Sequence, residues 1–274
     1  MTLQDFQDKK TRKEKLVMLT AYDYPTAHFM DQAGIDIILV GDSLANVVLG
    51  LESTREVGMA EMLHHAGAVA RAVKKAFTVG DMPYCAYQPH PQAAVDNARQ
   101  FMAVGCKAVK LEWFDGCAQV AKQIITAGIP VMGHVGLTPQ TAEDLGGLKV
   151  QGKDAKSAGE IITQAKALEK AGCFCIVLEC IPQEIAKIIT GSVSVPTIGI
   201  GAGIHCDGQV LVTHDLLGYG GQFQPKFTKQ YAHIGRQMSE AIKDFCVEVK
   251  KGKFPDEKHS YHIKAEELKS LKVS

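Results

Sequence analysis

The segment AVKLEWFDGCAQVAKQIITAGIPVMGHVG, residues 108–136, contains one complete strand–helix–strand unit. Its apolar runs Ala108–Leu111 and Val131–Gly133 are short and nearly continuous, as in parallel strands that are covered on both faces. Between them, Ala118–Ala127 has the amphipathic pattern of a helix and is followed by Gly128, a residue that commonly ends helices. The segment therefore predicts two parallel strands joined by a helix.

The same unit recurs along the whole chain. Apolar runs alternate with amphipathic stretches, several of which end in Ala-Gly or Val-Gly just before the next run. The eight predicted strands are Leu16–Thr20, Ile35–Val40, Phe77–Gly80, Ala108–Leu111, Val131–Gly133, Cys175–Leu178, Thr197–Ile200 and Gln209–Thr213. Eight such units in 274 residues favour an α/β fold closed into a single (β/α)8 TIM barrel over an open doubly wound sheet.

We predict one domain over residues 1–274, with two long loops and a carboxyl-terminal extension. The loops 43–57 and 137–154 break the rhythm of the repeat, and loops of such length are often functional. Residues Phe227–Lys251 have the pattern of one long helix. From about residue 254 the chain is polar and rich in lysine, so we expect a mobile tail.

Charge and composition exclude several classes of protein. Lys plus Arg and Asp plus Glu both number 30, so no net charge attracts nucleic acid or an anionic membrane surface. No apolar run reaches the roughly 18 residues of a membrane span. The eight cysteines lie mostly in apolar runs, and the first residues lack the apolar core of a signal peptide. We therefore expect buried free thiols in a cytoplasmic protein that acts on small molecules.

Acidic residues stand at the carboxyl ends of four predicted strands. They are Asp42, Asp81, Glu112 and Glu179, and His134 ends a fifth strand. In a barrel these ends meet at one mouth, where the active site forms. An Asp after a strand also caps helices, so Asp81 alone leaves both interpretations open, whereas Glu caps poorly. Four carboxylates at one mouth would repel one another and lose solvation unless a cation balances them.

The type and spacing of these side chains predict a divalent metal and an anionic substrate. Oxygen ligands without clustered Cys or His favour a hard ion, Mg²⁺ before Zn²⁺. Lys110 and Glu112 alternate with Leu111, so both side chains lie on one face of their strand and can point into the barrel. We expect Lys110 to face the anionic substrate and Glu112 to hold the metal.

Three other motifs have a simpler structural interpretation. Gly199-Ile-Gly-Ala-Gly203 follows the seventh strand, where barrels often bind phosphate, but it lacks the Gly-x-Gly-x-x-Gly pattern and a following lysine. We interpret it as a tight turn where a Cβ does not fit. His64-His65 is interpreted as helix surface and packing, and Cys173-x-Cys175 as buried thiols rather than a metal pair.

Nine longer motifs occur in order along the chain. They are Thr20-Ala-Tyr-Asp-Tyr24, Val40-Gly-Asp-Ser-Leu44, Val48-Leu-Gly50, Gly133-His-Val-Gly-Leu-Thr-Pro-Gln140, Lys149-Val-Gln-Gly152, Leu178-Glu-Cys180, Ile198-Gly-Ile-Gly-Ala-Gly203, Asp207-Gly-Gln-Val-Leu-Val212 and His259-Ser-Tyr-His262. Together they resemble the ketopantoate hydroxymethyltransferase family from about residue 14 to residue 262. Each motif is modest evidence, but the ordered set at family spacing is specific.

The resemblance implies a barrel of the phosphoenolpyruvate and isocitrate lyase type. Its reaction converts 3-methyl-2-oxobutanoate to 2-dehydropantoate, the first committed step of pantothenate biosynthesis, with Mg²⁺ as metal and 5,10-methylenetetrahydrofolate as one-carbon donor. The family's metal carboxylates fall on Asp42, Asp81 and Glu112. Its substrate contacts fall on Asp42, Ser43, Asp81, Lys110 and His134. The family also implies a homo-oligomer, typically a homodecamer.

The resemblance places the proton acceptor on Glu179. A 2-oxo acid bound through its ketone and carboxylate would form a Mg²⁺-stabilised enolate once Glu179 removes the proton from C3. The resulting carbanion would attack the methylene carbon of the folate, so no Ser or Cys nucleophile is needed.

Three positions depart from the family pattern. Ala45-Asn46 stands where Gly and a larger apolar residue are common, Trp113-Phe114 stands where Gly-Gly is usual, and Gly80 stands where alanine is frequent. Trp113 either reshapes the folate side of the pocket or packs under a loop. One rival interpretation is a related lyase, but its Lys-Lys-Cys-Gly-His loop does not occur in the sequence. The other is a non-catalytic barrel, which would not need the charged residues at the strand ends.

Overall fold

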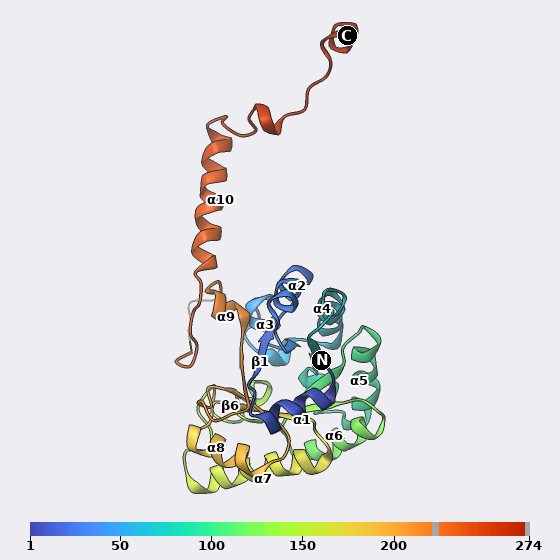
Figure 1. The fold of residues 1–274 in the computed structure, drawn as a ribbon, viewed down its shortest axis with the longest axis vertical. Coiled ribbons are helices and arrows are strands. Elements are labelled where there is room, and N and C mark those ends of the chain that lie inside the picture. Colours follow the sequence, from blue (N-terminus) through green and yellow to red (C-terminus); the bar gives the residue numbers. More distant parts are fainter. Residues whose placement is uncertain (221–224, 272–274) are drawn as a thin grey trace.

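The computed structural model describes residues 1–220 and 225–271. In these residues eight parallel strands form a closed barrel in chain order (Figure 1). The strands are β1 (Leu16–Thr20), β2 (Ile37–Val40), β3 (Phe77–Asp81), β4 (Ala108–Glu112), β5 (Val131–Gly136), β6 (Cys175–Glu179), β7 (Thr197–Ile200) and β8 (Gly208–Leu211). The barrel closes where β1 pairs with β8, with Leu16 opposite Gly208. The predicted eight-stranded barrel is confirmed, with strand ends that differ by at most a few residues.

Helices between the strands cover the outside of the barrel. The main ones are α2 (Tyr24–Ala33), α4 (Met59–Ala72), α5 (Ala94–Ala103), α6 (Cys117–Thr126), α7 (Ala155–Ala171) and α8 (Gln183–Ser192). Gly34, Gly128 and Gly172 follow α2, α6 and α7 with φ of +83°, +85° and +101°, a conformation that costs glycine little. The Ala-Gly pairs of the sequence therefore mark helix ends as predicted.

Short helical segments shape the loops above the strands. They are α3 (Leu44–Val47), α9 (Thr213–Leu217) and the 3₁₀ turns η1 (Thr54–Glu56), η2 (Tyr84–Ala86), η3 (Pro91–Ala93) and η4 (Pro139–Thr141). The two long loops predicted at residues 43–57 and 137–154 contain η1 and η4, which contact each other. The loops after β2 and β5 therefore meet over the barrel.

An amino-terminal helix, α1 (Leu3–Arg12), closes the other end of the barrel. Phe6 is fully buried and meets Phe77 and Phe174 edge to face, at ring distances of 5.1 and 5.0 Å. Lys10 Nζ pairs with Asp207 at 2.9 Å. Because these side chains fill the end where the strands begin, the carboxyl-terminal mouth is left as the opening for ligands.

The carboxyl-terminal extension differs from the prediction. Helix α10 begins at Ile234 and ends at Lys250, so a helix starting at Phe227 was wrong. The backbone before Ile234 pairs instead with the end of α9, with Tyr231 N–H donating to Leu216 O at 2.8 Å. The predicted tail contains η5 (Glu257–His259) and α11 (Ala265–Ser270), while residues 272–274 lie outside the described part.

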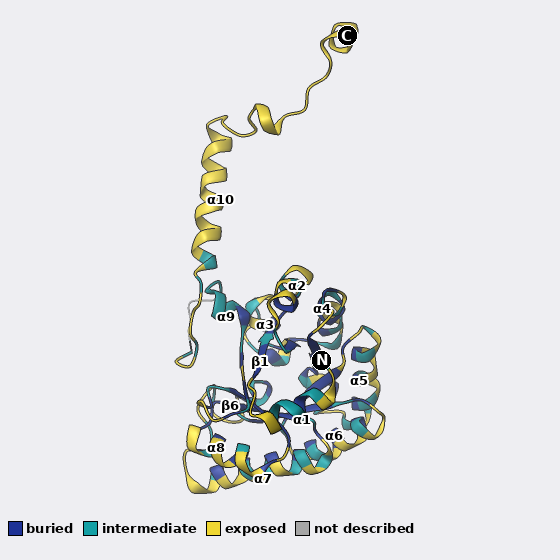
Figure 2. Cartoon of the chain, viewed as in Figure 1, coloured by how far each residue is buried: buried dark blue, intermediate teal, exposed yellow. Residues whose placement is uncertain are grey.

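Helix α10 extends away from the barrel and is exposed along most of its length (Figure 2). It carries a stripe of apolar residues. Met238, Ile242, Phe245 and Val249 recur at spacings of three or four residues, which places them on one helix face. Each of these side chains is between 46% and 60% exposed. We call these four residues the α10 apolar face.

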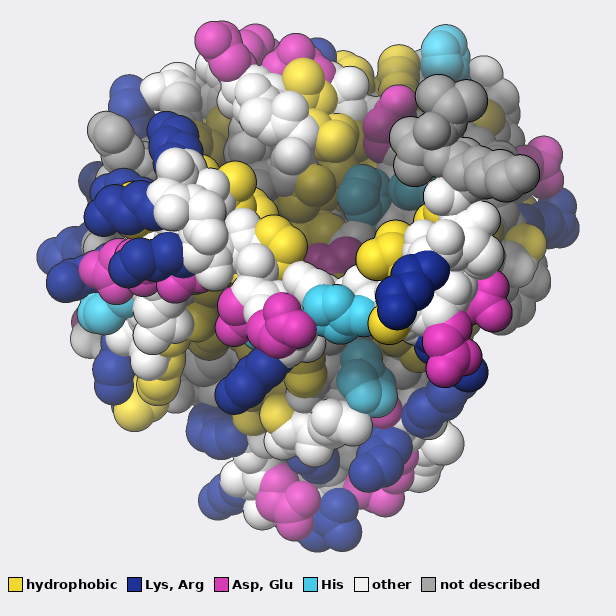
Figure 3. Space-filling view, turned by 90° about the horizontal axis from the view of Figure 1, so that it is seen from above, with side chains coloured by type: hydrophobic (Ala, Val, Ile, Leu, Met, Phe, Trp, Pro, Cys, Tyr) yellow, Lys and Arg dark blue, Asp and Glu magenta, His cyan; other side chains and the backbone are white. Residues whose placement is uncertain are grey.

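The surface carries charges of both signs, and the cysteines are mostly buried, as the composition predicted. Lysine, arginine and acidic side chains are interspersed across the face drawn in Figure 3. All eight cysteines are free thiols, and only Cys85 and Cys246 among them are exposed. Within the described residues, none of the helices has the length and apolarity needed to span a membrane.

Gly80 marks a close contact between sheet and helix beside the mouth. A Cβ at Gly80 would lie 2.3 Å from Cδ1 of Phe101, a fully buried ring of α5. An alanine at position 80 therefore does not fit opposite Phe101. The Phe101 ring occupies the space that a side chain at position 80 would need.

We expect Gly80→Ala to lower the free energy of unfolding by about 1–3 kcal/mol, because the extra methyl group overpacks the core. Combining it with Phe101→Leu, which shortens the opposing side chain, should recover part of that loss. Urea denaturation of both variants at equal protein concentration measures the difference. A double variant less stable than Gly80→Ala alone would show that the steric explanation is wrong.

Candidate active site

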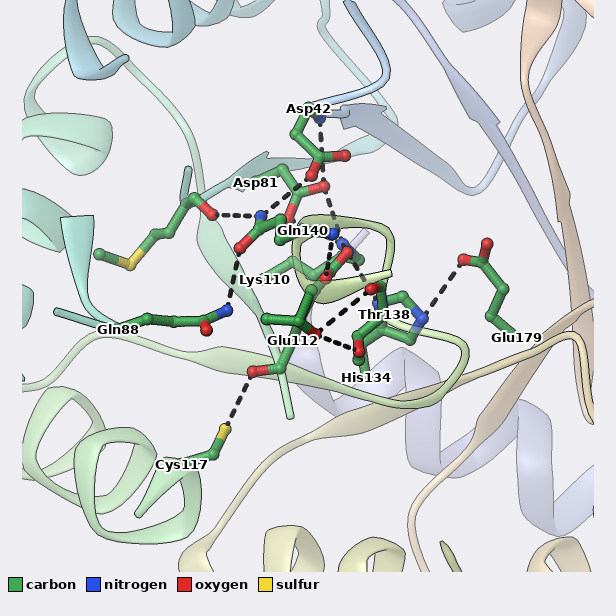
Figure 4. A network of polar contacts seen from close by, with 12 residues as sticks. Asp42, Asp81, Gln88, Lys110, Glu112, Cys117, His134, Thr138, Gln140 and Glu179 are labelled. Carbon is green, nitrogen blue, oxygen red and sulfur yellow. Dashed lines mark hydrogen bonds and ion pairs between the residues drawn. The ribbon is translucent and has the colours of Figure 1, made fainter. Parts of the chain in front are cut away.

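Five charged or titratable side chains meet inside the barrel mouth (Figure 4). Asp42, Asp81, Lys110, Glu112 and His134 are all buried, with at most 5% exposure. The strand register brings them together, because Asp81 lies opposite Lys110, and Glu112 lies opposite His134. The predicted placement of Lys110 and Glu112 on one inward face is therefore confirmed.

Lys110 is the cation at the centre of the cluster. Its Nζ lies 2.8 Å from both carboxylate oxygens of Asp81 and 3.8 Å from Glu112 Oε1. Burial lowers the pKa of Lys110, but the carboxylates of Asp81, Glu112 and Asp42 outweigh burial and raise it. Lys110 thus stays positively charged although it is buried.

Asp81 bonds to residues of this cluster and does not cap a helix. Besides Lys110, its Oδ2 accepts the backbone N–H of Asp42 at 3.2 Å, and the next helical turn starts after Pro83. The capping interpretation is therefore wrong. Burial raises the pKa of Asp81, the Lys110 ammonium opposes that rise, and Asp42 and Glu112 add to it. Asp81 is therefore the direct partner of Lys110 in this cluster.

His134 connects two acids on either side of its ring. Its Nδ1 lies 3.5 Å from Glu112 Oε1, and its Nε2 lies 3.3 Å from Glu179 Oε2. Burial and Lys110 lower the pKa of His134, but the two glutamates outweigh them and raise it to about 9. Glu179 reaches the cluster only at this edge, with its side chain 17% exposed.

The residues fit a hard divalent cation that keeps several water ligands. Glu112 Oε1 and both ring nitrogens of His134 are buried and make no hydrogen bond to the described residues. Within residues 1–220 and 225–271, no three Asp, Glu, His or Cys side chains converge as a complete metal site. Mg²⁺ is usually held by one or two carboxylates, with water and substrate oxygens completing its shell. Glu112 Oε1, which lies near Lys110 and His134 but makes no hydrogen bond to the described residues, is an oxygen that such an ion could take.

Ser43 and Trp113 lie at the margins of this cluster. Ser43 Oγ lies 2.8 Å from the hydroxyl of Tyr22. Trp113 is partly buried and lines a cavity of about 170 Å³ with Thr138, Leu145 and Ile161, under the β5 loop. This placement supports packing under a loop as the role of Trp113.

The glycines after β7 form a turn, as interpreted from the sequence. Gly201 and Gly203 have φ of +62° and +76°. A Cβ at Gly203 would lie 2.3 Å from Cβ of Gln183, and one at Gly201 would lie 2.8 Å from the ring of Phe227. Close packing accounts for these glycines without a phosphate.

Gln140 and Tyr87 also belong to the cluster, although the pattern of charged strand ends did not point to them. Both are fully buried, and Gln140 bonds to Asp42 and Glu112. Gln140 ends the motif that begins at Gly133 and lies in the long loop predicted to be functional. Its place in that motif and loop was the one feature of the sequence that could have pointed to Gln140.

Solved structures share the barrel. A phosphonopyruvate hydrolase, solved with oxalate and Mg²⁺, superposes with a TM-score of 0.63 at 13% identity over 98% of this chain and 94% of that one. A 2,3-dimethylmalate lyase of the PEP mutase/isocitrate lyase superfamily gives a TM-score of 0.61 at 12% identity, with the same coverage. The predicted barrel type is confirmed.

Sequence relatives identify the family. The profile described as "Ketopantoate hydroxymethyltransferase" matches residues 1–257. A 3-methyl-2-oxobutanoate hydroxymethyltransferase from Syntrophomonas wolfei is 52% identical over 99% of both chains. Another, from Thermoanaerobacter sp. strain X514, is 53% identical over 95% of this chain and 96% of that one. Matches of this length and identity show that the chain belongs to the ketopantoate hydroxymethyltransferase family, the enzymes that form ketopantoate from 3-methyl-2-oxobutanoate in pantothenate biosynthesis.

Proposed function

We propose that the barrel mouth binds 3-methyl-2-oxobutanoate, removes its C3 proton and joins C3 to a one-carbon unit from 5,10-methylenetetrahydrofolate. The observation that carries this assignment is the buried Lys110, which faces three carboxylates on one side of the mouth, while Glu179 stands at the other beside His134. Such a site offers a charge for an anionic substrate and a separate carboxylate for proton removal.

The substrate contacts are assigned to Asp42, Ser43, Asp81, Lys110 and His134. Lys110 offsets the charge of the substrate carboxylate, because its ammonium is buried beside the acids at the strand ends. Asp42, Asp81 and Glu112 would hold one Mg²⁺, directly or through water. When bound, Mg²⁺ supplies Lewis-acid polarisation of the substrate ketone.

Glu179 is assigned as the general base. It takes the proton from C3, and the electron pair of that C–H bond becomes the new bond to the one-carbon unit. That carbon leaves both folate nitrogens, and one water molecule supplies its hydroxyl group. The two nitrogens of the released tetrahydrofolate gain the other proton of that water and, in the net reaction, the proton from C3. His134 holds Glu179 from one side at 3.3 Å, so the carboxylate points toward the mouth. Glu179 lies apart from the proposed metal carboxylates, which leaves its oxygens free to accept a proton (Figure 4).

Proton NMR of 3-methyl-2-oxobutanoate in D₂O tests this function directly. With enzyme and Mg²⁺ and no folate, we expect the C3 proton signal to disappear as deuterium replaces it. A related lyase would instead cleave a C–C bond beside a 2-oxo acid. A non-catalytic barrel would leave all signals of the substrate unchanged, and either result would contradict the proposal.

The chain is proposed to act as a cytoplasmic, single-domain homo-oligomer, a homodecamer by resemblance to its family. The α10 apolar face supports association, because four half-exposed apolar side chains on one helix face gain from burial. Light scattering at micromolar concentration should give a mass several times the 29.6 kDa of one chain. A monomer mass would reject the prediction.

A further inference from the structure

Gln140 bonds to acids at the ends of two different strands of the mouth. Its backbone N–H donates to Glu112 Oε2 at 3.0 Å, and its side-chain Nε2 donates to Asp42 Oδ2 at 3.0 Å. Gln140 is fully buried, and it lies in η4 of the long loop after β5. A loop residue thus bonds to two of the carboxylates assigned to the metal.

The orientation of the Gln140 amide is fixed by its partners. Its Nε2 also donates to Met82 O at 3.0 Å, and its Oε1 accepts the hydroxyl of Tyr87 at 2.7 Å. A flipped amide would place its oxygen against the Asp42 carboxylate and the Met82 carbonyl, which are both acceptors. Only the observed orientation satisfies all the groups around it.

Tyr87 links the Gln140 amide to β4, the strand that carries Glu112. Its hydroxyl accepts the backbone N–H of Glu112 at 3.0 Å while it donates to Gln140. The ring is buried at the start of the loop between η2 and η3. Tyr87 therefore holds Gln140, and Gln140 holds Asp42.

We propose that Gln140, held by Tyr87, is a positioning residue that fixes the Asp42 and Glu112 carboxylates for the divalent cation and docks the β5 loop onto the mouth. The inference rests on the proposed function, because it assigns both acids to the metal. Gln140 has no charge and is not assigned a contact with substrate. Its loss therefore acts through the acids it holds.

The test measures binding of Mn²⁺ alone, as a stand-in for Mg²⁺, by the loss of its free-ion EPR signal in the full-length enzyme. Gln140→Met keeps the volume and the backbone N–H that donates to Glu112, but it removes the side-chain bonds to Asp42, Met82 and Tyr87. Tyr87→Phe removes only the hydroxyl. We expect Gln140→Met to weaken Mn²⁺ binding about 10–100-fold, as is common when the partners of metal ligands are lost. Tyr87→Phe should cause a smaller loss, and the loss in the double variant should be less than the two single losses combined, because the Tyr87 hydroxyl and the Gln140 amide bond to each other.

Asn97→Ala is the matched structural control. The Asn97 amide donates to Ala86 O at 2.8 Å and so ties α5 to the same loop without touching a carboxylate. It should lower the melting temperature and leave Mn²⁺ affinity unchanged. Wild-type Mn²⁺ affinity in folded Gln140→Met, or an equal loss in Asn97→Ala, would overturn the positioning role. Absence of Mn²⁺ binding to the wild-type enzyme would instead overturn the metal assignment of the proposed function, and this inference with it.

Discussion

Replacing Glu179 with glutamine is expected to slow exchange of the C3 proton of 3-methyl-2-oxobutanoate by about 10²–10⁴-fold, the usual contribution of a general base. The amide keeps the size of the side chain and cannot accept the proton. Binding of Mg²⁺ and of the 2-oxo acid should persist, because Lys110, Asp42 and Glu112 are untouched. Deuterium exchange followed by NMR without folate separates the proton-transfer step from the later C–C bond.

Glu184→Gln is the control, because Glu184 is an exposed acid five residues along the chain, in the first turn of α8. It should exchange at the wild-type rate. If Glu179→Gln also exchanges at the wild-type rate, Glu179 is not the base. His134, whose Nε2 lies beside Glu179, then becomes the next candidate.

Neutralising two of the metal carboxylates is expected to have the second large effect. The double variant Asp81→Asn and Glu112→Gln should weaken Mg²⁺ affinity by at least about 10–100-fold, a loss that even indirect contacts to a metal commonly show. Isothermal titration with Mg²⁺ and the Mg²⁺ dependence of deuterium exchange both measure it. Asp115→Asn, at an exposed acid just after Glu112, is the control. An unchanged Mg²⁺ requirement and affinity in the double variant would refute the metal assignment.

The two single variants should differ in stability without metal. Asp81→Asn breaks a buried ion pair and leaves Lys110 without its closest partner, which costs about 3–5 kcal/mol. Glu112 lies 3.8 Å from Lys110 Nζ, beyond hydrogen-bond distance, whereas both oxygens of Asp81 lie 2.8 Å from it, so Glu112→Gln should cost less. Thermal melting in EDTA compares them.

The pattern of apolar runs predicted the barrel because each buried strand has to be apolar on both faces. The placement of Lys110 and Glu112 on one face was also predicted correctly, because side chains two residues apart on a strand point to the same side. The start of α10 could not be read from the sequence. The residues before Ile234 are compatible with a helix, but their backbone pairs with α9, a contact that only the fold creates.

The network around Gln140 was missed for a related reason. An uncharged amide gives no signal of its own, and its role depends on how the β5 loop folds back toward β2 and β4. For Asp81 the sequence allowed a role as a helix cap, but in the structure its carboxylate bonds to Lys110 on the neighbouring strand. Local patterns fixed the strands, whereas contacts between loops arise only in the assembled barrel.

The aromatic plug formed by Phe6, Phe77 and Phe174 constrains the order of events in the proposed reaction. With that end filled, the 2-oxo acid and the much larger folate share one entrance. In the proposed function the 2-oxo acid pairs with the buried Lys110, so a folate already seated in the mouth would obstruct its arrival. The steady-state kinetics should therefore be sequential and ordered, with the 2-oxo acid entering first and tetrahydrofolate departing before the hydroxymethylated product.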